Sequence, residues 1–204
     1  MTLADIGLLV LRLGLGLTFA AHGAQKAFGW WNGPGAVGWR AAMERMGFRP
    51  VGLFAPASTG IELVGGIFMA LGLLTPFVAG ILVAQTVVII AKVHWSKGFF
   101  NTAGGYEFPL SLGLAAAAIA LLGPGGVSLD GLLGVAWAPE LGLALIALGL
   151  LGGAVALQAP RMTAPQLPAP QAQAPASAAI VGRHVSEPSR PGRNTLPRNT
   201  LRRT

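Results

Sequence analysis

Five stretches of almost unbroken apolar residues run along the chain, and short segments that hold most of the charges separate them. A helix needs about 20 apolar residues to cross the hydrocarbon of a bilayer, and about 17 is the lower limit. Four stretches reach or approach this limit once their flanks are added, and the fifth only just does. We therefore expect five membrane-spanning helices, over residues 6–28, 56–74, 77–93, 108–122 and 141–157.

Turn residues and small residues indicate how these helices connect and pack. Thr75-Pro76 predicts an N-cap followed by the first helical residue, so the second and third helices form a tight antiparallel hairpin. The Gly-Pro-Gly-Gly run at 123–126 predicts the end of the fourth helix. Small residues let membrane helices approach closely. The expected contact positions are Gly14, Gly16, Gly65, Gly66 and the GxxxG pair Gly149/Gly153.

The first connection, residues 29–55, contains a predicted amphipathic helix. Val37, Trp39, Met43 and Met46 fall on one side of it, and Gly47 follows at the position of a C-cap glycine. Such a helix is typical of the headgroup region of a bilayer. Four tryptophans, Trp30, Trp31, Trp39 and Trp95, are expected on the same membrane side as an interfacial belt.

Composition agrees with a lipid-embedded protein. Of 204 residues, 53% are hydrophobic and 10% are charged, and the mean hydropathy is +0.63. Soluble domains carry about 25% charged residues. The chain has no cysteine, which excludes disulfides, cysteine-ligated iron–sulfur clusters and a thiol relay of its own. The sequence thus predicts an all-α integral membrane protein whose redox chemistry, if it has any, needs a bound cofactor or a partner.

The basic charge is concentrated at the end of the chain. The net charge is +7, and residues 158–204 hold seven arginines against one acid, Glu187. A basic tail gives no support for nucleic-acid binding by the body of the protein. Eight prolines and almost no large apolar residues predict that 158–204 is disordered, as a solvated tail or as a segment that adheres to anionic lipid or a partner. The expected organisation is a four-helix membrane domain (1–135), an additional helix (136–157) and the tail (158–204).

Antiparallel threading brings several polar side chains to one membrane side, here called side B, which is reached at the end of the first helix. A charged residue within a membrane span costs about 2.5 to 3.5 kcal/mol and usually faces the helix bundle. Glu62 is the clearest example, and Lys26 and His22 are its expected partners. This cluster either binds a polar head and handles a proton, since imidazole exchanges protons near neutral pH, or is an ion pair that fixes helix register. The residues expected at side B are His22, Lys26, Glu62, His94, Tyr106 and Glu107.

Other polar residues have simpler interpretations. Gln85 is expected to form a helix–helix hydrogen bond, and the long stem of Arg12 is expected to reach the interface at the opposite side, side A. No HExxH or CxxCH motif is present, so the histidines do not favour a metal or haem site.

Several motifs together resemble the DoxX family of small bacterial and archaeal membrane proteins, over about residues 6–135. The resemblance implies a four-helix membrane bundle of DoxX type and an association with quinone- or sulfur-linked redox complexes in the cell membrane. It also adds Gln25 to the candidate cofactor-binding residues, which are then His22, Gln25, Lys26, Glu62, His94, Tyr106 and Glu107. The fifth apolar stretch, the basic tail and the lack of cysteine depart from the family pattern. The motifs are Leu11-Arg12-Leu13, His22 to Gly29 (HGAQKAFG), Glu62 to Gly66 (ELVGG), His94-Trp95, Gly98-Phe99-Phe100, Gly104 to Pro109 (GGYEFP), Gly123-Pro124-Gly125 and Ser128-Leu129-Asp130.

Three functions remain open at this point. The first is a redox subunit in which the side B cluster binds a quinone head and a partner subunit delivers electrons. The second is a non-enzymatic component that organises a membrane complex, as a monomer or a homo-oligomer. The third is a small-molecule or lipid transporter, which buried charges would also fit.

Charge distribution predicts the orientation in the membrane. Side B carries six lysines and arginines, whereas side A carries Arg12 alone. Short cytoplasmic loops are enriched in Lys and Arg, so side B is expected in the cytoplasm. The resemblance implies the opposite orientation, because members of the family are usually drawn with both ends of a four-helix bundle in the cytoplasm.

Overall fold

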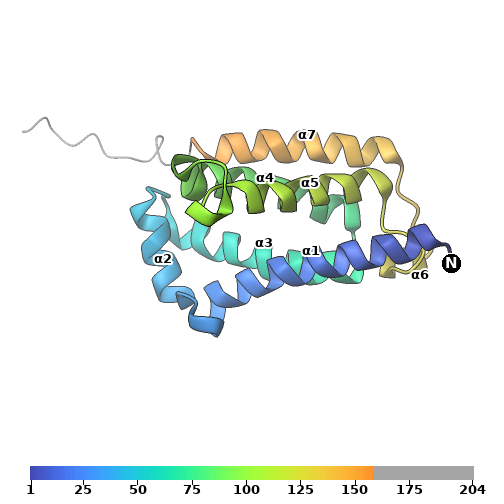
Figure 1. Cartoon of the computed structure of the whole chain (residues 1–204), viewed down its shortest axis with the longest axis horizontal. Coiled ribbons are helices and arrows are strands. Elements are labelled where there is room, and N and C mark those ends of the chain that lie inside the picture. The colour runs from blue at the N-terminus through green and yellow to red at the C-terminus, as the bar shows by residue number, and fades with distance from the viewer. Residues whose placement is uncertain (159–204) are drawn as a thin grey trace, which may run out of the picture. The chain divides into compact units, whose positions relative to one another are not determined.

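Long apolar helices dominate the computed structural model, which describes residues 1–158 (Figure 1). In this part of the chain all regular structure is helical, as predicted. Four helices are long and apolar enough to cross a membrane: α1 (Leu3–Phe28), α3 (Val51–Leu71), α4 (Thr75–Ile89) with its continuation to Lys97, and α7 (Pro139–Ala156). The other apolar helix, α5 (Glu107–Leu122), has 16 residues and is about 24 Å long. The expectation of an all-α membrane protein is confirmed.

Helix α1 pairs along its length with α3. Thr2 begins α1 with a capping box, in which its hydroxyl accepts from the Asp5 amide and its own amide donates to Asp5, and Gly29 ends the helix with φ 74°. At the crossing, a Cβ at Gly16 would approach the Ala70 amide, and one at Gly66 would overlap the Ala20 backbone. These two glycines therefore let α1 and α3 touch backbone to backbone. Gly14 is not such a contact, because the space around it is open.

Helices α3 and α4 form the predicted hairpin, but the expected N-cap is wrong. Leu74 is the N-cap residue, with φ 51°, and Thr75 already lies in the helix. The amides of Leu74 and Thr75 and the Thr75 hydroxyl all donate to Asp130, at 2.8, 2.9 and 2.8 Å. Asp130 lies in α6 (Leu129–Leu132), so a distant carboxylate caps α4 in place of the local hydroxyl.

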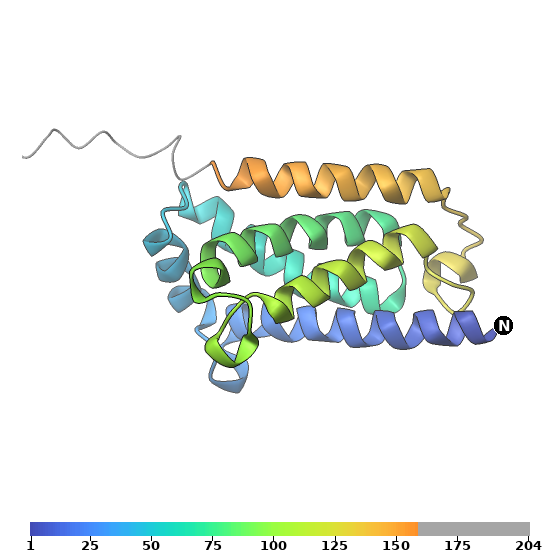
Figure 2. The same cartoon turned by 45° about the horizontal axis from the view of Figure 1, so that its top comes forward.

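Helix α7 packs against α4 and α5 and runs from the α6 end of the bundle to the α2 end (Figures 1 and 2). A Cβ at Gly149 would overlap the Gly80 carbonyl oxygen, and one at Gly153 would lie 2.8 Å from the Ala84 carbonyl oxygen. The GxxxG pair is thus a contact within the chain. It makes α7 part of one compact unit with the other helices.

The predicted amphipathic helix is α2 (Gly35–Arg45), and it lies across the side B end of the bundle (Figure 1). Met43 is buried, and Trp39 and Met46 pack beside it, against Phe48 and Ala55. Gly47 follows the helix with φ 85°, as expected. Val37 does not belong to this apolar face, since it is 85% exposed.

Two further outcomes concern the predictions for Arg12 and for the C-terminal tail. Arg12 does not reach the interface: it is fully buried, and its Nη2 donates to the Val127 carbonyl oxygen. The predicted disordered tail, apart from Gln158, lies outside the described residues. The division into 1–135, 136–157 and 158–204 therefore stays a prediction.

Candidate functional site

The centre of the candidate site is an ion pair between α1 and α3. Lys26 Nζ lies 2.5 Å from Glu62 Oε1. Glu62 is 1% exposed and the Lys26 side chain 13%, so both charges are withdrawn from solvent. The pair was expected from the threading, and Lys26 lies in the last turn of α1.

Neighbouring side chains hold this pair in position. Gln85 Nε2 on α4 donates to Glu62 Oε1 at 2.9 Å and to Ser58 Oγ at 2.8 Å. Lys26 Nζ also lies 4.1 Å from the centre of the Trp39 ring on α2, a cation–π contact. The ion pair therefore joins four helices, and the helix–helix hydrogen bond expected of Gln85 is confirmed as part of the same cluster.

One oxygen of Glu62 remains without a donor. Oε2 is buried and has no hydrogen-bond partner among the described residues, and the same holds for Trp39 Nε1. A buried polar atom left unpaired costs about 1 to 3 kcal/mol. Such atoms are rare in folded proteins and point to a water or a ligand that completes them.

Glu62, Lys26 and Trp39 line a cavity of about 370 Å³ between α1, α4 and α5. His94 and His22 line it as well. The His94 Nδ1 lies 2.6 Å from the Gly104 carbonyl oxygen. Because a carbonyl can only accept, Nδ1 carries the proton, and Nε2 of the neutral ring is left as an acceptor. His22 packs near Phe108, with ring centres 6.4 Å apart.

The other three candidates lie outside the lining of this cavity. Tyr106 stacks on Trp95 with ring centres 5.3 Å apart, and Glu107 Oε2 accepts from the Asn101 amide at 2.9 Å. Both contacts shape the 98–106 loop. Gln25 is half-buried and packs against Gly33, where a Cβ would overlap it. The structure thus brings together His22, Lys26, Glu62 and His94, and it separates Gln25, Tyr106 and Glu107 from them.

Sequence reasoning missed a second buried polar cluster, at side A. Arg12 packs against Gly72, where any side chain would overlap the guanidinium, and Asp130 accepts from Trp137 Nε1 as well as from the start of α4. The Arg12 Nε and Nη1 atoms are buried without partners among the described residues. The signals in the sequence were a charged residue, Arg12, within an apolar run and the motif Ser128-Leu129-Asp130. This cluster fixes loops and lines no cavity with the side B residues.

Comparison with known families gives one match. The family model described as DoxX matches residues 7–95. This match supports membership of the DoxX family. No curated protein and no solved structure matches it.

The DoxX match covers α1 to α4, and with them His22, Lys26, Glu62, Gln85 and His94. Helices α5 and α7 lie outside the matched residues. The protein is therefore a multi-pass membrane protein with a DoxX-type segment, and two further apolar helices complete the bundle.

The arrangement limits the chemistry of the cavity that Glu62, Lys26 and Trp39 line. It offers the Lys26 ammonium, one unpaired carboxylate oxygen of Glu62 and the imidazoles of His94 and His22. Apart from Thr86 and Asn101, the rest of the wall is aromatic and aliphatic. Within residues 1–158 no three His, Asp or Glu side chains gather as metal ligands would. The cavity fits a small, largely apolar molecule with oxygen atoms that both accept and donate hydrogen bonds.

Proposed function

We propose that the cavity of this DoxX-family protein binds the head of a membrane quinone or quinol in the cell membrane, as part of a redox complex. A quinone head is a flat apolar ring with two carbonyl oxygens, which become hydroxyl groups on reduction. A partner subunit exchanges the electrons, because the chain has no cysteine to form a thiol relay.

The unpaired Glu62 Oε2 carries this proposal. A quinol hydroxyl can donate to it, and the second hydroxyl can donate to His94 Nε2 on the opposite helix. In the oxidised form, a carbonyl oxygen accepts from the Lys26 ammonium, which has further protons beyond the one shared with Glu62. Oxidation of a quinol releases two protons, and the two acceptors on the cavity wall are suited to receive them.

The first test measures quinone binding to the purified full chain and to Glu62→Gln. The substitution preserves the shape of the side chain but removes its charge and one of its acceptor oxygens. Affinity for a short-tailed quinol should fall at least tenfold, since a hydrogen bond to a charged group contributes about 1.5 to 3 kcal/mol. Lipid extraction and the absorption spectrum of the purified protein show in addition whether it carries a native quinone.

Glu140→Gln is the matched control, because Glu140 is an exposed acid in the first turn of α7 and lies outside the cavity. Its quinol affinity should stay within twofold of the unmodified chain. Unchanged binding by Glu62→Gln together with a lower melting temperature would contradict the proposal. That result would favour the non-enzymatic alternative, in which the Lys26–Glu62 pair joins α1 to α3 and the protein organises a membrane complex.

A further inference from the structure

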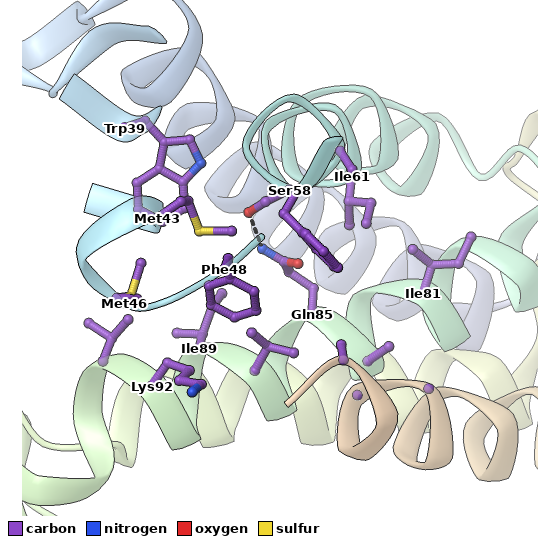
Figure 3. A pocket seen from close by; sticks show the side chains of 18 residues that line it. Trp39, Met43, Met46, Phe48, Ser58, Ile61, Ile81, Gln85, Ile89 and Lys92 are labelled. Atoms are coloured by element: carbon purple, nitrogen blue, oxygen red, sulfur yellow. Dashed lines mark hydrogen bonds between the residues drawn. The ribbon is translucent and has the colours of Figure 1, made fainter. Parts of the chain in front are cut away.

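A second cavity, of about 320 Å³, lies on the other face of α4 (Figure 3). Residues of α3, α4 and α7 form its long walls, and residues of α2 together with Phe48 line its side B end. Trp39, Ile89 and Val93 line both this cavity and the one beside Glu62 and Lys26, which we call the quinone cavity, and form a common wall. We call this second cavity the α4 slot.

The α4 slot is elongated along the helix axis. On α4 its wall consists of residues at helical spacing from Ile81 to Val93, and on α3 from Phe54 to Ile61. The rise from Ile81 to Lys92 is about 16 Å. This is close to half of the hydrocarbon thickness of about 30 Å, which is the depth of one leaflet.

Small residues leave this space open between two helices that share a neighbour. Helices α3 and α7 both pack on α4, but they do not pack closely on each other. Gly152, Gly153 and Ala156 on α7 face the gap, and a Cβ at Gly152 would meet nothing within 4 Å. Helix α7 lies outside the DoxX match, so one wall of the slot is formed by residues beyond the matched segment.

The chemistry of the slot is polarised along its length. Its deep part is apolar, apart from Ser58 and Gln85, which are hydrogen-bonded to each other (Figure 3). At the side B end, Lys92 is half-buried, and its charge lies 5.5 Å from the centre of the Phe48 ring. Within the described residues no carboxylate pairs with Lys92. An apolar channel of one leaflet's depth with an unneutralised cation at the headgroup level is complementary to an anionic amphiphile.

We propose that the α4 slot holds one acyl chain of an anionic lipid from the side B leaflet, and that Lys92 binds the negative charge of the headgroup. A phospholipid and a free fatty acid share this chemistry. The proposal does not depend on quinone binding, because its polar contact, Lys92, does not line the quinone cavity.

The test is native mass spectrometry of the delipidated full chain, titrated separately with phosphatidylglycerol, with phosphatidylcholine of the same acyl chains, and with palmitate. One phosphatidylglycerol per chain should bind in preference to phosphatidylcholine. Lys92→Gln should weaken its binding roughly fivefold, the effect of about one lysine charge near a membrane surface. Lys97→Gln, at an exposed cation of the same end outside the slot, should leave binding unchanged.

A second pair of variants tests the apolar channel. Gly152→Leu fills the slot without a backbone clash and should abolish the bound lipid, whereas Gly14→Leu on the open face of α1 should not. If Gly152→Leu does not fold, Ala57→Leu fills the slot from the α3 wall. Palmitate binding with the same sensitivity to both variants, in place of phosphatidylglycerol, supports the proposal with the free acid as ligand.

Two results would overturn it. Equal binding of phosphatidylcholine and phosphatidylglycerol would remove the role of Lys92. Displacement of the lipid by a long-chain quinone, with loss of quinone binding in Gly152→Leu, would assign the slot to a quinone tail. Failure of Glu62→Gln to affect quinol binding would leave this proposal standing, since the two ligands use different polar groups.

Discussion

Asp130 connects the α3–α4 turn to Trp137 through one carboxylate. It is 1% exposed and accepts hydrogen bonds from the backbone of Leu74, from the backbone and hydroxyl of Thr75, and from the Trp137 indole. Its own amide donates to the Gly72 carbonyl oxygen at 2.9 Å. A negative charge at the start of a helix is also stabilised by the helix dipole. Asp130 therefore fixes the α3–α4 turn against the loop that leads to α7.

This geometry predicts a pH-dependent stability. Burial raises the pKa of Asp130, but the hydrogen bonds from Thr75, Trp137 and Leu74 outweigh it and hold the pKa below its usual value of 3.8. Because the folded pKa is the lower one, the stabilisation is present above pH 3.8 and is lost as the pH falls through the folded pKa. Asp130→Asn should lower the free energy of unfolding by about 1 to 3 kcal/mol at pH 7, and the difference should shrink in acid.

Thermal unfolding in detergent between pH 7 and pH 3 measures this effect. Glu140→Gln, an exposed acid in the first turn of α7, is the control and should leave the pH profile unchanged. A constant difference between Asp130→Asn and the unmodified chain over the whole pH range would argue against the charge of Asp130 as the stabilising group.

At the residue scale, the depth of a polar side chain in the membrane was predictable, but the direction in which the side chain points was not. Threading placed Lys26 and Glu62 at one level, and they are paired. Glu107 reaches the same side but turns toward its own loop, because the Asn101 amide is its donor. Arg12 was expected to extend to the interface, yet the returning loop supplies Val127 as an acceptor inside the bundle. Loop contacts of this kind depend on tertiary packing, which apolar periodicity does not encode.

At the element scale, the α4–α7 contact predicts which glycines are essential. Gly149→Ala would place a methyl group against the Gly80 carbonyl oxygen, whereas Gly152→Ala, one turn along the same helix, meets open space. Overpacking costs about 1 to 3 kcal/mol. Gly149→Ala should therefore lower the free energy of unfolding by this amount, and Gly152→Ala should not lower it. Equal effects of the two variants in denaturant titrations would mean that α7 does not pack closely on α4.

The existence and order of the helices were predictable because lipid requires long apolar runs, and the five expected stretches are α1, α3, α4, α5 and α7. Helix ends were less predictable. Thr75 lies within α4 because Asp130, 55 residues away, caps it. The α4 slot could not be predicted at all, since it results from the lack of close packing between α3 and α7.

At the scale of the whole molecule, the structure sharpens the charge asymmetry between the two membrane sides. Arg12 is buried against the Val127 carbonyl and is not a loop charge, so it does not count for side A. Lys26 is paired with Glu62 and does not count for side B. The remaining cations near the membrane are all at side B, namely Arg40, Arg45, Arg49, Lys92 and Lys97. Five charges against none still predict that side B faces the cytoplasm.

The direction of α7 allows the predicted membrane orientation to be tested at the end of α7 as well. Because α7 runs from the α6 end to the α2 end, the last turn of α7 lies at side B, the side that carries the other cations (Figure 2). The lack of cysteine allows a direct test, since a single introduced thiol has no background. Ser96→Cys and Gln158→Cys should be protected from a membrane-impermeant maleimide in intact cells, and Ala136→Cys at side A should be labelled. Labelling of Ser96→Cys and Gln158→Cys with protection of Ala136→Cys would reverse the orientation but keep α7 as a crossing. Opposite results for Ser96→Cys and Gln158→Cys would instead show that α7 does not cross the bilayer.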